Sequence, residues 1–248
     1  MTTASIPHAS LDRVLLRVDA IWHPESAVHH LIYGMTGSGK STLIKSLLGL
    51  CADERVLILD PKPHPDQVWD GSAEDPDRWG RPVTSAGPVL GGQREGGGPH
   101  GLWFRLSGTP DRAETARLFR DALATVAAEG HYVLVLDDVR EITRQLRLAE
   151  HVDSVMNLGR SANVLAILSA TETGYVAGRA QAAMTWIGHT SGLDAAKAGA
   201  NLLGHSGRAW YETTGAVNPH EWIYADSQPG NSGPCIVAGG PRQDNHPG

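Results

Sequence analysis

The chain has 248 residues, of which 41% are hydrophobic and 19% are charged, and its formal net charge is -6 at pH 7. A chain of this length can bury the core of one large α/β domain. The acidic balance excludes a surface that is basic throughout, so any contact with a polyanion must come from a local patch. Cys51 and Cys235 are too few for a disulfide framework or a cysteine metal site.

Nothing in the sequence predicts a membrane segment. Residues 1–10 lack a basic stretch followed by an apolar core, and no apolar run approaches the roughly 20 residues needed to cross a bilayer. We therefore expect a cytoplasmic protein with no direct membrane insertion.

The first predicted elements lead into a glycine-rich segment. Alternation of apolar and polar residues predicts a strand over 11–21, and a second strand follows over about 28–33. After the glycine-rich segment we expect a helix to about Leu50. The short apolar run Arg55–Asp60, stopped by Pro61, is typical of a buried parallel strand.

The middle of the chain contains a long loop and a well-marked helix. Glycine-rich residues 85–101 predict a mobile surface loop. Trp69, Trp79 and Trp103 flank this part of the chain and are expected to pack on the core, the alternative being a subunit interface. Thr109-Pro110-Asp111 is an N-cap and first-turn signature for a helix that continues to about Glu129.

The later elements complete an α/β pattern. We expect buried strands over 132–136, 164–168 and 184–188, a helix over 142–158, and antiparallel edge strands over 208–212 and 221–224. Residues 227–248 are rich in Gly, Pro, Ser and Asn and predict a disordered tail, which leaves 1–226 as a single domain. Strands alternating with helices predict a mostly parallel central sheet with helices on both faces and a ligand beyond the carboxyl ends of the strands.

The glycine-rich segment after residue 33 has the form of a phosphate-binding loop. Its glycines let the backbone wrap around a polyphosphate, and the helix that follows adds its positive N-terminal end. Lys40 is expected to reach the outer phosphates, and the Ser41 hydroxyl to hold Mg²⁺. The sequence thus predicts binding of ATP and Mg²⁺ by Gly34, Thr36, Gly37, Ser38, Gly39, Lys40, Ser41 and Thr42.

A second motif delivers paired carboxylates. The apolar run Tyr132–Leu136 ends in Asp137 and Asp138. We expect Asp137 to bind Mg²⁺ together with Ser41, and Asp138 to orient or deprotonate the attacking water. Two alternatives remain open: Asp138 as the N-cap of the next helix, and Glu141 as the base.

Other polar residues suggest weaker hypotheses. Arg140, Arg144 and Arg147 have helical spacing and would share one face, toward DNA phosphates in a central pore, toward acids on the next subunit, or toward solvent. The adjacent His29 and His30 point to opposite faces of a strand, so the sequence argues against a zinc site there.

The chain resembles the FtsK and HerA group of P-loop motors, which includes conjugative coupling proteins and viral genome-packaging ATPases. The resemblance spans about residues 28–208. It is carried by His29–Ser41, Leu57–Lys62, Leu134–Asp138, Leu158–Glu172 and Leu202-Leu203-Gly204. It implies a RecA-like P-loop NTPase fold.

Two positions depart from the family pattern. The family usually has Glu where this chain has Asp138, and it ends a later strand in Ala-Thr-Gln where this chain has Ala170-Thr171-Glu172. Either Thr171 senses the γ-phosphate or Glu172 supplies the missing acid, and the sequence does not choose between them. In such motors a neighbouring subunit supplies an arginine. The resemblance assigns this role first to Arg160, with Arg179 and Arg208 behind it.

The resemblance implies ATP-driven translocation of double-stranded DNA by a ring-shaped homo-oligomer, with a hexamer favoured. Viral genome packaging and plasmid transfer are the processes that such a compact chain suggests, which would place a viral protein in the host cytoplasm. Tethering would depend on a partner protein. The alternatives are a protein-secretion ATPase of the related type and an ATP-binding switch or assembly factor with little turnover.

Overall fold

The described strands form one sheet. A computed structural model describes residues 6–22, 28–51, 54–63, 69, 81–83, 103–171, 182–205, 208–227 and 233–238. The strands within these residues are β1 (His8–Ser10), β2 (His29–Tyr33), β3 (Val56–Asp60), β4 (Arg81–Val83), β5 (Trp103–Ser107), β6 (Tyr132–Leu136), β7 (Val164–Ala170), β8 (Ala182–Ile187), β9 (Glu221–Asp226) and β10 (Cys235–Ala238). Their order is β1-β10-β9-β8-β2-β7-β6-β3-β5-β4.

The described sheet is parallel except at β9, which lies near one end of it. Strand β2 pairs in parallel with both β7 and β8, and β6 pairs in parallel with β7 and β3. Strand β9 runs antiparallel to β8 and to β10. The predicted mostly parallel sheet is confirmed, and so is the antiparallel strand near residues 221–224.

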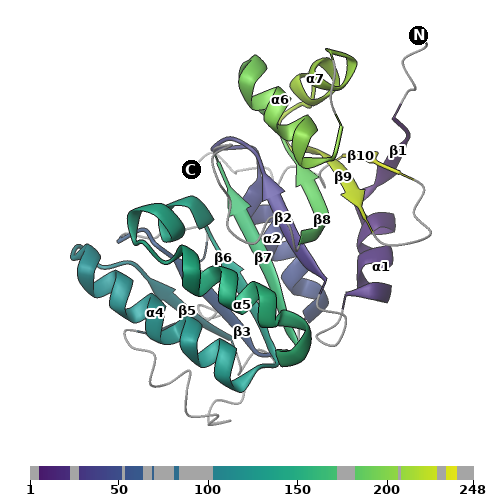
Figure 1. The fold of residues 1–248 in the computed structure, drawn as a ribbon. Coiled ribbons are helices and arrows are strands. Elements are labelled where there is room, and N and C mark those ends of the chain that lie inside the picture. The colour runs from purple at the N-terminus through teal and green to yellow at the C-terminus, as the bar shows by residue number, and fades with distance from the viewer. Residues whose placement is uncertain are drawn as a thin grey trace, which may run out of the picture.

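Helices cover both faces of the sheet, as predicted (Figure 1). Alternate residues of β3 and β6 divide between two apolar clusters. One cluster holds α4 and α5, and the other holds α1 and α2. The bounds are α1 (Leu11–Ile21), α2 (Lys40–Leu48), the short 3-10 helix η2 (Gly49–Cys51), α4 (Arg112–Glu129), the π-helical turn η4 (Glu141–Gln145), α5 (Ala149–Ala162), α6 (Leu193–Leu202) and α7 (Arg208–Gly215).

The predicted strand over 11–21 is wrong, because this segment is helix α1. Val14, Val18 and Trp22 are buried at a spacing of four residues, which matches a helix, while Leu16 is 71% exposed. The Ser10 side chain accepts a hydrogen bond from the backbone N–H of Arg13 and caps the helix. The apparent alternation concealed this helical period.

The predicted edge strand over 208–212 is also wrong, because these residues begin helix α7. Thr214 is buried and its hydroxyl donates to the carbonyl of Ala196 at 2.7 Å, which joins α7 to α6. Arg208 and Glu212 form an ion pair at a spacing of four residues along the helix.

Two further predictions need correction. The predicted helix over 142–158 is divided, since η4 ends at Gln145, Arg147 has a left-handed backbone with φ of 57°, and α5 begins at Ala149. Arg140, Arg144 and Arg147 therefore do not lie on one continuous helix. The predicted disordered tail over 227–248 is wrong for Cys235–Ala238, which form β10 between β9 and β1.

Some sequence-based predictions concern residues that the structure does not describe. These are the mobile loop over 85–101, Trp79, Glu172 and Arg179. Trp69 and Trp103 are described, and both are buried in the cluster that holds α1 and α2. Within the described residues, no helix has the length and apolar character to cross a bilayer.

Candidate functional site: a phosphate loop facing two carboxylates

The segment Gly34–Thr42 leaves β2 at the centre of the sheet. The N–H of Gly34 donates to the carbonyl of Ala170, and the N–H of Met35 donates to the carbonyl of His189. These bonds hold the start of the loop to the ends of the strands on either side of β2. A side chain at Gly34 would place its Cβ 2.7 Å from the Ser38 Oγ, so the turn requires glycine here.

The end of the loop forms the N-terminus of α2. Gly39 occupies the N-cap position with φ of 91°, which favours glycine, and no side chain caps the helix. The first N–H groups of a helix lack intrahelical acceptors and carry partial positive charge. The Ser38 hydroxyl is buried and has no hydrogen-bond partner. Together these unmatched donors fit an anion such as a phosphate.

Lys40 folds back over this loop. Its Nζ donates to the carbonyls of Gly34 at 2.8 Å and Met35 at 3.0 Å. Burial lowers the pKa of Lys40, while Asp137 and Asp138 act in the opposite direction and raise it. The ammonium group is therefore within electrostatic reach of both carboxylates.

Asp137 is fixed by donors from two other elements. It follows β6, is 7% exposed, and its Oδ1 accepts from the Ser169 hydroxyl at 2.7 Å. Its Oδ2 accepts from the indole N–H of Trp69 at 3.2 Å. Ser169 also accepts from the backbone N–H of Asp138 at 2.9 Å, so one hydroxyl orients both acidic residues.

Neither Ser169 nor Trp69 was predicted to belong to the site, since Trp69 was expected only to pack on the core or at a subunit interface. Ser169 had a detectable signal, because it lies near the carboxyl end of β7, the strand beside β6. Trp69 had none, since the chain between Asp60 and β5 shows no pattern that places its indole against β6.

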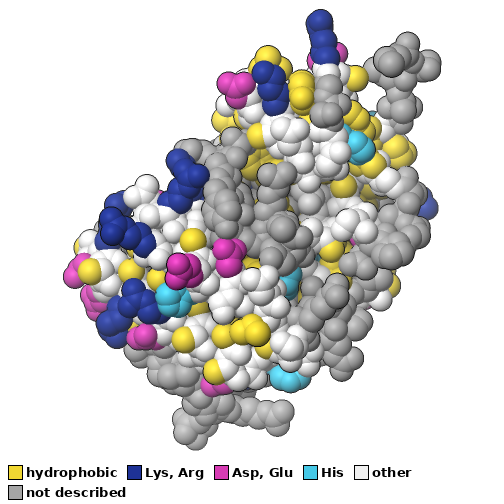
Figure 2. Space-filling view, viewed as in Figure 1, with side chains coloured by type: hydrophobic (Ala, Val, Ile, Leu, Met, Phe, Trp, Pro, Cys, Tyr) yellow, Lys and Arg dark blue, Asp and Glu magenta, His cyan; other side chains and the backbone are white. Residues whose placement is uncertain are grey.

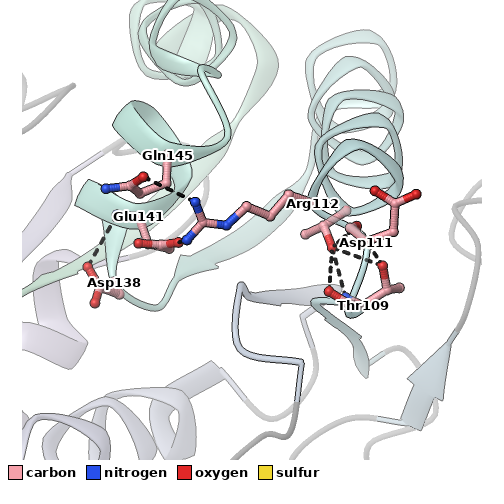
Figure 3. A network of polar contacts seen from close by, with 7 residues as sticks. Thr109, Asp111, Arg112, Asp138, Glu141 and Gln145 are labelled. Atoms are coloured by element: carbon pink, nitrogen blue, oxygen red, sulfur yellow. Dashed lines mark hydrogen bonds and ion pairs between the residues drawn. The ribbon is translucent and has the colours of Figure 1, made fainter.

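Asp138 begins a network that reaches the start of α4 (Figure 3). Its backbone is left-handed with φ of 58°, and its Oδ1 accepts from the N–H of Glu141 at 3.4 Å. The Glu141 carboxylate pairs with Arg112 at 3.3 Å, and Arg112 also donates to Gln145. Asp138 therefore accepts from the first N–H of η4, as the N-cap alternative expected, although Arg140 occupies the N-cap position. Glu141 points its carboxylate to Arg112.

A second buried carboxylate, Asp60, lies near Asp137. Burial, and then the charge of Asp137, raise the pKa of Asp60 to about 6, although the N–H of Lys62 donates to its Oδ1 at 3.1 Å. Asp60 ends β3, the parallel neighbour of β6. The Asp-Pro-Lys tripeptide therefore lies at the carboxyl ends of the strands, as Asp137 does.

The arginines occupy different positions. Arg160 is near the end of α5, where the carbonyl of Ala162 accepts from the N–H of His131 just before β6. The end of α5 therefore lies at the amino ends of the strands, whereas the phosphate loop lies at their carboxyl ends. Arg208 is exposed on α7 and pairs with Glu212.

His29 and His30 are both engaged as hydrogen-bond acceptors. The Nδ1 of His29 accepts from the N–H of Ala166, and the Nδ1 of His30 accepts from the indole N–H of Trp186 at 3.0 Å. Burial lowers the pKa of His30 to about 3, so its ring is neutral. In the described part of the chain, no group of three or more His, Cys, Asp or Glu side chains is arranged to hold a metal ion.

Comparison with solved structures relates this fold to a genome-packaging NTPase and to a conjugative coupling protein. The genome-packaging NTPase B204 from Sulfolobus turreted icosahedral virus 2 aligns with a TM-score of 0.58 and 18% identity, over 86% of this chain and 96% of B204. The bacterial conjugative coupling protein TrwB aligns with a TM-score of 0.58 and 13% identity, over 94% of this chain and 92% of that chain. The chain shares its fold with these two proteins.

A third similar structure is a secretion ATPase. The cytoplasmic domain of the Thermomonospora curvata type VII secretion ATPase EccC aligns with a TM-score of 0.50 and 18% identity, over 86% of this chain and 26% of EccC. B204 has been solved in complexes with AMP and with ATP-gammaS. No protein-family model and no curated protein sequence matches this chain.

Proposed function

We propose that this chain is an ATPase that moves double-stranded DNA as a ring-shaped oligomer, with a hexamer favoured. One observation carries the proposal. Lys40 and the uncapped start of α2 lie within electrostatic reach of Asp137 and Asp138, in a fold shared with a packaging NTPase and a conjugative coupling protein.

The described residues fit ATP and Mg²⁺. The buried, unpartnered Ser38 hydroxyl and the uncapped first turn of α2 match phosphate oxygens. Ser41 and Asp137 would hold Mg²⁺, which neutralises charge on the outer phosphates when it is bound. Asp137 suits this role because Ser169 and Trp69 fix the direction of its carboxylate.

The remaining roles belong to residues around this centre. Lys40 would exchange the loop carbonyls of Gly34 and Met35 for phosphate oxygens. Asp138 would orient the attacking water, with Glu172 as the alternative acid. Arg160 lies at the opposite edge of the sheet from its own phosphate loop, which supports action in a neighbouring subunit rather than within one chain.

DNA binding would depend on local groups of basic residues. The face of the molecule drawn in Figure 2 carries Lys and Arg side chains over α4 and over α6 and α7. Asp and Glu side chains lie among them. Several are paired, as in Arg117 with Asp121 and Lys197 with Asp194. A ring would bring such small groups together around one axis and so strengthen their field.

The test is the ATPase rate with duplex DNA, with single-stranded DNA and without DNA, run beside mass determination with and without ATP. We expect duplex DNA to stimulate hydrolysis and ATP to favour the oligomer. If no length of DNA stimulates ATP hydrolysis, the proposal that this chain translocates DNA is refuted.

A second candidate is a protein-secretion ATPase, which the similarity to EccC and the net charge of -6 favour. Such an enzyme would respond to a partner peptide rather than to DNA. A third candidate is a switch with little turnover, which the capping contact of Asp138 favours. Tight ATP binding with near-zero hydrolysis under all of these conditions would select it.

A further inference from the structure

His220 lies against the phosphate loop although the two are far apart in the sequence. A Cβ built on Gly39 would be 2.9 Å from the Nδ1 of His220, and the three atoms nearest to that position all belong to the His220 ring. The His220 side chain is otherwise exposed, and its backbone is left-handed with φ of 68°. The histidine thus contacts the last glycine before Lys40 and keeps surface open to a ligand.

A closed turn holds His220 in this position. The N–H of Glu221 donates to the carbonyl of Asn218 at 3.0 Å, and both the N–H and the side-chain amide of Asn218 donate to the Glu221 carboxylate. Trp222 then anchors the start of β9, since a Cβ on Gly188 would be 2.6 Å from its ring. The position of the imidazole therefore follows from the fold and not from a mobile loop.

The order of the strands indicates which end of a nucleotide would meet His220. Strands β7 and β6 lie on one side of β2, and β8 and β9 lie on the other. Asp137, the residue assigned to the outer phosphates and the metal ion, belongs to the β6 side. A nucleotide with its outer phosphates toward Asp137 extends its ribose and base toward β9.

We propose that His220 binds the ribose of a nucleoside di- or triphosphate and thereby makes the loop prefer nucleotides over bare polyphosphate. An imidazole can donate or accept a hydrogen bond at a ribose hydroxyl. This inference rests on the proposed nucleotide site. It adds a binding residue that the glycine-rich motif does not contain.

The experiment compares ATP, ADP and inorganic tripolyphosphate by titration calorimetry in the presence of Mg²⁺, using the full chain. His220→Ala should weaken ATP and ADP binding by roughly tenfold, the effect of one lost hydrogen bond, and leave tripolyphosphate binding unchanged. His220→Asn should recover part of the loss, because Asn accepts a left-handed backbone and keeps a polar group.

The chain offers a matched control in His131. It is also exposed and left-handed, with φ of 57°, but it lies before β6 at the opposite edge of the sheet. His131→Ala should bind all three ligands as the wild type does.

Three results would overturn the inference. Equal weakening of ATP and tripolyphosphate in His220→Ala would mean that the histidine only supports the loop, and unchanged ATP binding would mean that it does not touch the nucleotide. A wild-type chain that binds neither ATP nor tripolyphosphate would refute the proposed function as well, which separates the two failures.

Discussion

Two regions of the sheet meet the phosphate loop in different ways. At the centre, β6 and β7 bring Asp137, Asp138 and Ser169 together, and the Ser169 hydroxyl is hydrogen-bonded to both acidic residues. At the β9 end, His220 contacts Gly39 and presents an exposed ring. Asp137 and Ser169 are buried, Asp138 is half-buried, and the three depend on one another, so substitutions there should act on chemistry. Changes at the β9 end should act on ligand preference.

The largest effect should come from Lys40→Ala. Removal of the ammonium leaves phosphate charge without its main neutralising group, so ATP hydrolysis should fall by roughly a thousandfold or more. Steady-state phosphate release measures this. Lys197→Ala, which removes an exposed ammonium from α6, should keep the wild-type rate. If Lys40→Ala hydrolyses ATP at the wild-type rate, the loop that contains Lys40 does not take part in hydrolysis.

Asp138→Asn separates the two roles of this residue. Asn caps a helix as well as Asp does, but it cannot take a proton. If Asp138 orients or deprotonates water, kcat should fall by roughly a hundredfold while the midpoint of thermal unfolding stays unchanged. A variant with wild-type kcat would show that Asp138 serves only as a hydrogen-bond acceptor at the start of η4. Glu172 would then be the remaining candidate for the acid that orients the water.

Ser169→Ala should have a smaller effect. It removes the donor to Asp137 and the acceptor for the N–H of Asp138, so both acids lose their orientation. We expect kcat to fall by roughly tenfold and stability to fall by about 1–3 kcal/mol, as for a buried hydrogen bond. Ser161→Ala, which alters an exposed hydroxyl on α5, is the control. Unchanged kcat in Ser169→Ala would mean that Trp69 alone can hold Asp137.

The smallest effect on activity should come from His30→Asn. This substitution changes the pH dependence of the free energy of unfolding, because His30 on β2 is hydrogen-bonded to Trp186 on β8. Because the pKa of His30 is about 3 in the folded chain and 6.5 in the unfolded chain, the unfolded chain binds more protons as pH falls below 6.5. The wild type should therefore lose about 1.4 kcal/mol per pH unit between pH 6.5 and 4. His30→Asn keeps an acceptor for Trp186 but cannot be protonated.

Urea unfolding of both chains at pH 7 and pH 5 gives the measurement. The raised pKa of Asp60, about 6 against an ordinary 3.8, stabilises the folded chain as pH falls through this range. Both chains contain Asp60, so the difference between them isolates His30. An identical loss of stability in the two chains would show that His30 does not resist protonation.

The same two regions explain which predictions from sequence succeeded. Central parallel strands are buried on both faces, so Tyr132–Leu136 appears as a continuous apolar run, and the predicted strand has the observed bounds. The β9 end mixes helices with antiparallel strands. There the apolar pattern of 208–212 was assigned to a strand, although α7 buries Thr214 against α6.

The sequence alone predicted a phosphate loop and placed two acids at the end of a strand, because glycines, a lysine and an apolar run ending in two carboxylates are local features. Only the tertiary structure decided that Ser169 and Trp69 hold Asp137 and that His220 lies on Gly39. These contacts join residues distant in the chain. They depend on the order of strands in the sheet, which local periodicity does not encode.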